Sequence, residues 1–99
     1  MNLTRITATA PRAAAASVVD CSAITAVIWA AAVPDDQIEH ITTTYSRSGQ
    51  LDIGIFTAAL TRSGARASAR RLIQRVADTS PELAGWSISA PRTEELDSL

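Results

Sequence analysis

The chain of 99 residues has no lysine, one cysteine, one histidine and four aromatic residues. A single cysteine cannot form an intrachain disulfide, so a disulfide-stapled scaffold is excluded. Some proteins bind single-stranded RNA by stacking its bases on aromatic side chains of a β-sheet. Four aromatic residues are too few to form such a platform. The four glycines are scattered, which excludes a glycine-rich phosphate loop.

Charge of either sign is also scarce, because charged residues make up 19% of the chain and the formal net charge is −1. No global field therefore draws the chain to nucleic acid or to an anionic membrane. Hydrophobic residues make up 46%, which is too many for an intrinsically disordered protein. A chain of this length is expected to fold as one domain around one modest core.

Alternating and helical patterns predict four strands and two helices. The strands are expected at residues 3–10, 38–47, 51–60 and 86–90, and the helices at residues 12–33 and 65–78. The first helix is rich in alanine, and Asp20 would lie within it. Ser63 is the expected N-cap of the second helix, whose apolar residues fall on one stripe. That stripe comprises Ala65, Ala69, Leu72, Ile73 and Val76.

The order β-α-β-β-α-β is that of the ferredoxin-like split βαβ sandwich. We therefore predict an α+β fold with a four-stranded antiparallel sheet and both helices on one of its faces. The domain is expected to span residues 1–91. Residues 92–99 are polar and acidic and are expected to form a flexible tail.

The apolar stretch at residues 12–33 is long enough to span a membrane, and small residues at 30–32 would suit signal cleavage. Against this, Asp20 interrupts it, and a charge at the centre of a span costs about 2.5–3.5 kcal/mol. Alanine also favours lipid very little. We expect a helix of the folded domain in a cytoplasmic protein, with the signal or membrane segment as the open alternative.

Few residues could carry catalysis. Cys21 is placed in the middle of the first helix on its apolar stripe, where a small buried hydrophobe is expected rather than a nucleophile. His40 is the weak candidate for a general base, against a solvated histidine at a strand edge. The chain has no G-x-S-x-G, C-x-x-C or H-E-x-x-H motif. We therefore expect no metal and no cofactor, and the absence of these motifs favours a non-catalytic protein over an enzyme.

Five of the nine arginines lie between residues 62 and 75, with no acidic residue among them. Arg62, Arg66 and Arg70 are spaced four residues apart, so they would share one face of the second helix. Arg71 and Arg75 flank that stripe. It could be a solvated helix face, or it could bind an anion or an acidic partner, for example the chain's own acidic tail. Nucleic-acid binding is a weaker alternative, because aromatic residues are scarce.

Apolar residues exceed what one small core needs. The strand at 51–60 presents apolar side chains to both faces, and the first helix is apolar on nearly all sides. Apolar surface on a small protein commonly marks an interface. The residues expected at that interface are Val19, Trp29, Val33, Phe56 and Leu60.

These observations predict a small non-catalytic interaction or regulatory module that self-associates and binds a protein partner. One alternative is a small-ligand-binding protein or cofactor-free enzyme of the dimeric α+β barrel type, in which two sheet faces enclose a pocket. In that case His40, Tyr45 or Trp86 would lie near the pocket. The other alternative is nucleic-acid binding through the arginine stripe.

Overall fold

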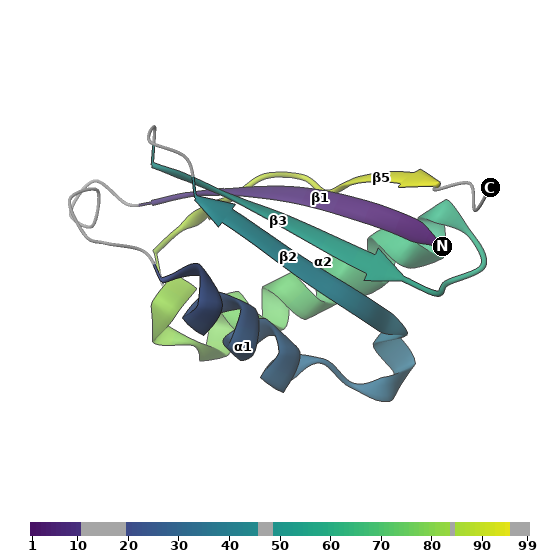
Figure 1. Ribbon diagram of the computed structural model, residues 1–99, viewed down its shortest axis with the longest axis horizontal. Coiled ribbons are helices and arrows are strands. Elements are labelled where there is room, and N and C mark those ends of the chain that lie inside the picture. Colours follow the sequence, from purple (N-terminus) through teal and green to yellow (C-terminus); the bar gives the residue numbers. More distant parts are fainter. Residues whose placement is uncertain (11–19, 46–48, 84, 96–99) are drawn as a thin grey trace.

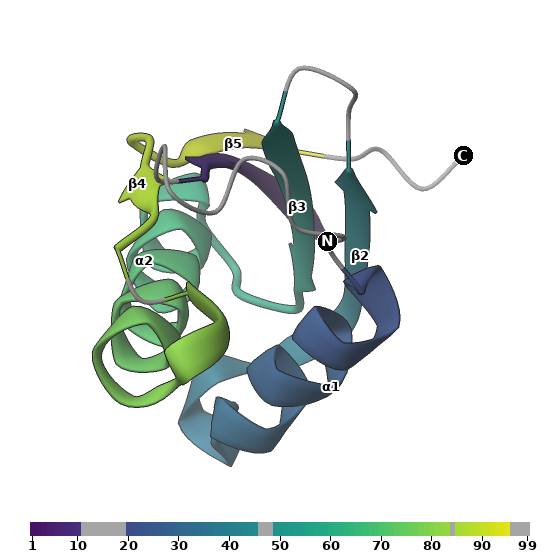
Figure 2. The same ribbon diagram turned by 90° about the vertical axis from the view of Figure 1, so that its left-hand side faces the viewer.

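The computed structural model describes residues 1–10, 20–45, 49–83 and 85–95 (Figure 1). It is an α+β fold in which two helices pack on one face of a mostly antiparallel sheet (Figure 2). The elements are β1 (Asn2–Thr9), α1 (Cys21–Ala31), a 3-10 turn η2 (Pro34–Asp36), β2 (Ile38–Tyr45), β3 (Gln50–Thr57), α2 (Arg62–Thr79), a 3-10 turn η3 (Pro81–Leu83), β4 (Ser87–Ile88) and β5 (Arg92–Glu95).

Strand β1 lies inside the sheet, with partners on both sides. The order across the described sheet is β2-β3-β1-β4, and β5 also pairs with β1. β3 pairs with β1 along its whole length, from Asn2↔Thr57 to Thr9↔Gln50. β4 and β5 share the other edge of β1, at Ala8 and Thr9 and at residues 2–5 respectively. All of these pairings are antiparallel.

The alternating patterns that predicted the long strands correspond to two different faces of the sheet. Residues at alternate positions face the helices and are buried, whereas their neighbours face away. The buried helix-facing residues of the three strands include Thr4, Ile6, Ala8, Ile41, Leu51, Ile53, Ile55 and Thr57. The predicted stripe of α2 is buried against them, from Ala65 to Val76. From α1, Ile24 and Ile28 complete this core.

The start of α1 differs from the prediction. Asp20 is not a charge inside the helix but its N-cap, with extended backbone and a carboxylate that accepts the N–H groups of Ser22 and Ala23 at 3.0 and 3.2 Å. Aspartate is a strong capping residue because it satisfies donors that lack a partner in the first turn. Cys21 is therefore in the first turn and not in mid-helix. The predicted helical residues 12–19 lie outside the described part.

Neither α1 nor α2, nor any other helix in the described residues, has the length and apolar content needed to cross a membrane.

The start of α2 also differs by a small shift. The N-cap is Thr61 rather than the predicted Ser63, and its hydroxyl accepts the N–H of Gly64 at 3.0 Å. Ser63 lies one residue inside the helix, which begins at Arg62. Both residue types cap well, so the pattern alone did not separate them.

The C-terminal segment forms more sheet than predicted. The strand expected at 86–90 is limited to Ser87–Ile88, and Pro91 follows, which cannot donate to a ladder. Ser89 bridges the interruption, because its N–H donates to the Thr7 carbonyl at 2.8 Å and its hydroxyl accepts the Thr7 N–H at 2.9 Å. Residues 92–95, expected in a flexible tail, then pair with β1 as β5.

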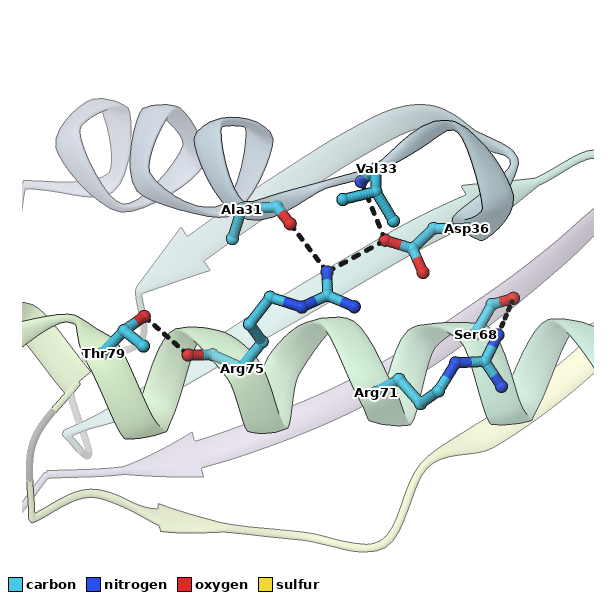
Figure 3. A network of polar contacts seen from close by, with 7 residues as sticks. All are labelled: Ala31, Val33, Asp36, Ser68, Arg71, Arg75 and Thr79. Atoms are coloured by element: carbon cyan, nitrogen blue, oxygen red, sulfur yellow. Dashed lines mark hydrogen bonds and ion pairs between the residues drawn. The ribbon is translucent and has the colours of Figure 1, made fainter.

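Arg75 ties α2 to the end of α1 (Figure 3). Its Nη1 donates to the carbonyl of Ala31 at 2.7 Å and to the Asp36 carboxylate at 3.1 Å. The Asp36 side chain is only 2% exposed and also accepts the N–H of Val33 at 3.0 Å. One guanidinium therefore satisfies a terminal helix carbonyl and a buried carboxylate. This contact fixes the α1–η2 connection on α2.

Replacing the cap tests the observed start of α1. Asp20→Ala should lower the free energy of unfolding by about 1 kcal/mol, because the N–H groups of Ser22 and Ala23 lose their acceptor. Urea unfolding followed by circular dichroism measures this change. Asp35→Ala is the matched control, since Asp35 is exposed and should change stability by less than about 0.5 kcal/mol. Equal effects of the two variants would contradict the cap.

A substitution of Arg75 tests its contact with the buried Asp36 carboxylate, which we call the clamp. Arg75→Met should lower the free energy of unfolding by about 2–3 kcal/mol, because it leaves the Asp36 carboxylate buried without its counter-charge. Asp36→Asn should recover part of that loss when combined with Arg75→Met, since the amide carries no charge. Arg70→Met, at an exposed position of the same helix, is the control for loss of an arginine. A change no larger than that control would show that the clamp contributes little.

Candidate binding surfaces

The face of the sheet that the helices leave open is more polar than predicted. Leu3 and Phe56 are its large apolar residues, and Ala58 and Leu60 are not on it because β3 ends at Thr57. The other side chains on this face are polar or charged, and they include Arg5, Thr7, Thr42, Thr44, Asp52, Arg92 and Glu94. An antiparallel sheet with one solvated face normally shows this alternation.

A shallow hollow of about 530 Å³ lies on this open face. Gly54 is part of its lining, and a Cβ there would lie 2.5 Å from the Thr42 hydroxyl oxygen and 3.4 Å from Leu3. Apolar contact is available from Leu3 and Phe56, and charge from Arg5, Asp52 and Arg92. The hollow can therefore accept a flat, partly apolar group that carries an anion.

His40, the weak catalytic candidate, lies on the same face but does not line the hollow. It is exposed, and its ring lies 5.6 Å from the ring of Phe56. No carboxylate or hydroxyl of the described residues forms a hydrogen bond with it. Tyr45 and Trp86 pack partly buried against the helix-side core. The three residues expected around a sheet-face pocket are thus not brought together.

A second groove, of about 450 Å³, runs between α1 and β2. Its lining is uncharged and consists of Cys21, Ser22, Thr25, Thr42 and Thr43. Thr25 and Thr43 join the two elements, because their hydroxyls are 2.8 Å apart and both donate to the Cys21 carbonyl. Cys21 itself is half-buried against the core.

The predicted interface residues lie in different places. Trp29 and Val33, at the end of α1 and after it, are 40% and 45% exposed. Phe56 is half-buried on the open sheet face, and Leu60, fully exposed, belongs to the connection between β3 and α2. Val19 is outside the described residues. Trp29 is four residues from Thr25, so it lies on the side of α1 that faces the β2 edge.

The five arginines of α2 do not form one surface. Arg62, Arg66 and Arg70 are exposed, as predicted, but Arg75 turns toward α1 in the clamp described above. Arg71 donates to the Ser68 hydroxyl at 3.2 Å. Glu94 belongs to the acidic segment that was one possible partner of the stripe, but it pairs with Arg5 on the open face at 3.1 Å.

Two arginines of the stripe meet a third that the sequence did not single out. A groove of about 510 Å³ between α2 and the edge of the sheet is lined by Arg62, Arg66 and Arg92. Arg70 does not line it. Arg92 belongs to the segment predicted to be a flexible tail, and no local pattern places it beside α2. The pairing of β5 with β1 puts it there.

Within the described residues, no three histidine, cysteine, aspartate or glutamate side chains are grouped so that they could hold a metal ion. Three surfaces of the described residues are candidates for binding: the sheet-face hollow, the uncharged α1–β2 groove and the groove lined by Arg62, Arg66 and Arg92.

Comparison of the chain with models of protein families, with curated proteins and with solved structures gave no match.

Proposed function

We propose that this chain is a non-catalytic interaction module that self-associates through α1 and the edge of β2 and binds a protein partner. The observation that carries self-association is the uncharged, partly apolar side of the molecule formed by these two elements. α1 contains no charged residue, and Trp29 and Val33 remain exposed at its end. β2 contains one acidic residue, Glu39.

The occupant that best fits this side is a second copy of the chain. β2 is eight residues long and is an outer strand of the described sheet, so its outer backbone groups need a strand as partner. A two-fold interface places the same patch on both subunits, which requires a patch that does not repel itself. The uncharged α1–β2 side meets this requirement, whereas the arginine-rich side of α2 does not.

We also infer that the architecture is the ferredoxin-like sandwich. The support is the order β2-β3-β1-β4 together with two crossover helices on one face of the sheet. In such a sheet β2 and the C-terminal strand form opposite edges. A dimer joined through β2 would leave the β5 edge and its arginine groove free on each subunit.

Trp29 should be the anchor of the self-associated form. Trp29→Glu should weaken the dimer at least about 30-fold, because it removes a central aromatic contact and buries a charge. Sedimentation equilibrium across a range of concentrations should show a dimer for the unmodified chain and the 10.4 kDa monomer for this variant. Ala26→Glu, on the same exposed side of α1, should act in the same direction.

Leu60→Glu is the matched control, since it makes the same apolar-to-acidic change at a fully exposed residue on another element. It should leave the dimer intact. A strictly monomeric unmodified chain at high concentration, or a dimer lost in Leu60→Glu and kept in Trp29→Glu, would refute the proposed interface.

The sheet-face hollow supports a second candidate function, the binding of a small amphipathic ligand. Its floor at Gly54 and its mixed lining are the observations in favour. Anilinonaphthalene sulfonate, which combines flat rings with an anion, is a suitable probe. Its fluorescence with the folded chain should fall strongly in Arg5→Glu, which reverses a charge in the lining of the hollow, and remain in Leu60→Ala. Unchanged fluorescence in Arg5→Glu would dismiss this candidate.

A further inference from the structure

The groove between α2 and β5 gathers positive charge from two elements that are distant in sequence. Arg62 and Arg66 come from the first turns of α2, and Arg92 comes from the start of β5. The remaining lining is small or uncharged, namely Ser63, Ala90, Pro91 and Thr93. No acidic side chain of the described residues lines this groove.

The three arginines have no counter-charge within the described residues. None of them forms an ion pair or a hydrogen bond with a described side chain, whereas Arg5 and Arg75 have acidic partners. Glu94, the acid next in the sequence to this groove, has its carboxylate on Arg5. A local positive site therefore exists on a chain whose net charge is −1.

A guanidinium presents a planar fork of donors that matches a carboxylate or a phosphate. Arg62 and Arg66 lie on α2, and Arg92, whose side chain is on the open face opposite Arg5, borders the groove at the edge of the sheet. Three guanidiniums that border one groove match a ligand with more than one negative group. No aromatic ring is among the described residues that line the groove, so these residues offer no surface on which the bases of a single-stranded nucleic acid could stack. This favours carboxylates on a polypeptide over phosphates on a nucleic acid.

The groove also lies beside a strand with an unused edge. β5 pairs with β1 on one side, and no described strand pairs with its other side. Extended peptides bind such edges by main-chain hydrogen bonds, while their alternate side chains reach neighbouring pockets. An extended acidic peptide could therefore satisfy the edge and the arginines together.

We propose that this groove binds an extended acidic segment of a partner protein, with its carboxylates on Arg62, Arg66 and Arg92. The proposal names the partner class of the module proposed above. It does not depend on self-association, because β5 and β2 lie at opposite edges of the sheet. A dimer joined at β2 presents two such grooves and would bind a partner with two acidic segments more tightly than the monomer.

The test uses the full chain and a fluorescein-labelled peptide in which glutamate alternates with threonine. Fluorescence anisotropy at low ionic strength should show binding that weakens as salt increases. Arg66→Gln and Arg92→Gln should each weaken binding about tenfold, because each removes hydrogen bonds to a charged group. Arg70→Gln, an exposed arginine of the same helix outside the groove, should change it less than twofold.

Three further arms decide the outcome. A peptide with glutamine in place of glutamate should not bind, and binding of this peptide would refute the role of the carboxylates. Oligothymidylate of equal charge should bind more weakly, and tighter binding would replace the acidic peptide by nucleic acid. Equal losses of peptide affinity in Arg92→Gln and Arg70→Gln would refute binding at the groove. Failure of Trp29→Glu to dissociate the dimer would bear only on the self-association proposal.

Discussion

The position of β1 inside the sheet is the constraint on which the rest of the structure depends. Its eight residues pair with β3 on one side and with β4 and β5 on the other. Its helix-facing residues Ile6 and Ala8 meet the core that α1 and α2 cover. Because both edges of β1 need backbone partners, the C-terminal segment is drawn into the sheet although its own side chains are polar. The same pairing carries Arg92 to the side of α2.

The contact between Arg75 and Asp36 is the second constraint, and it decides which arginines are available for binding. A carboxylate that is 2% exposed requires a partner charge, and the guanidinium that supplies it also satisfies the terminal carbonyl of Ala31. Arg75 is thereby removed from the surface of α2. Arg62 and Arg66, near the start of the helix, remain at the surface and lie beside the β5 edge.

The two edges of the sheet differ in character as a result. At the β2 edge, α1 contributes an uncharged surface with Trp29 exposed, which suits contact with an identical copy. At the β5 edge, Pro91 and short strands interrupt the ladder and three arginines surround the groove, so a like-charged second copy is disfavoured there. The proposed self-association and the proposed partner binding would therefore use opposite sides of one small domain.

The sequence by itself determined the period-2 and helical patterns, and with them the faces of β1, β2 and β3 and the buried stripe of α2. These follow from local side-chain geometry, in which each residue's direction is set by its neighbours in the chain. It did not determine the strand at residues 92–95, because Arg-Thr-Glu-Glu becomes a strand only beside the free edge of β1. The contact of Arg75 with Asp36 likewise depends on which distant segments the fold brings together. The same is true of the groove that Arg62, Arg66 and Arg92 line. Contacts of that kind have no local pattern, so only the tertiary structure could decide them.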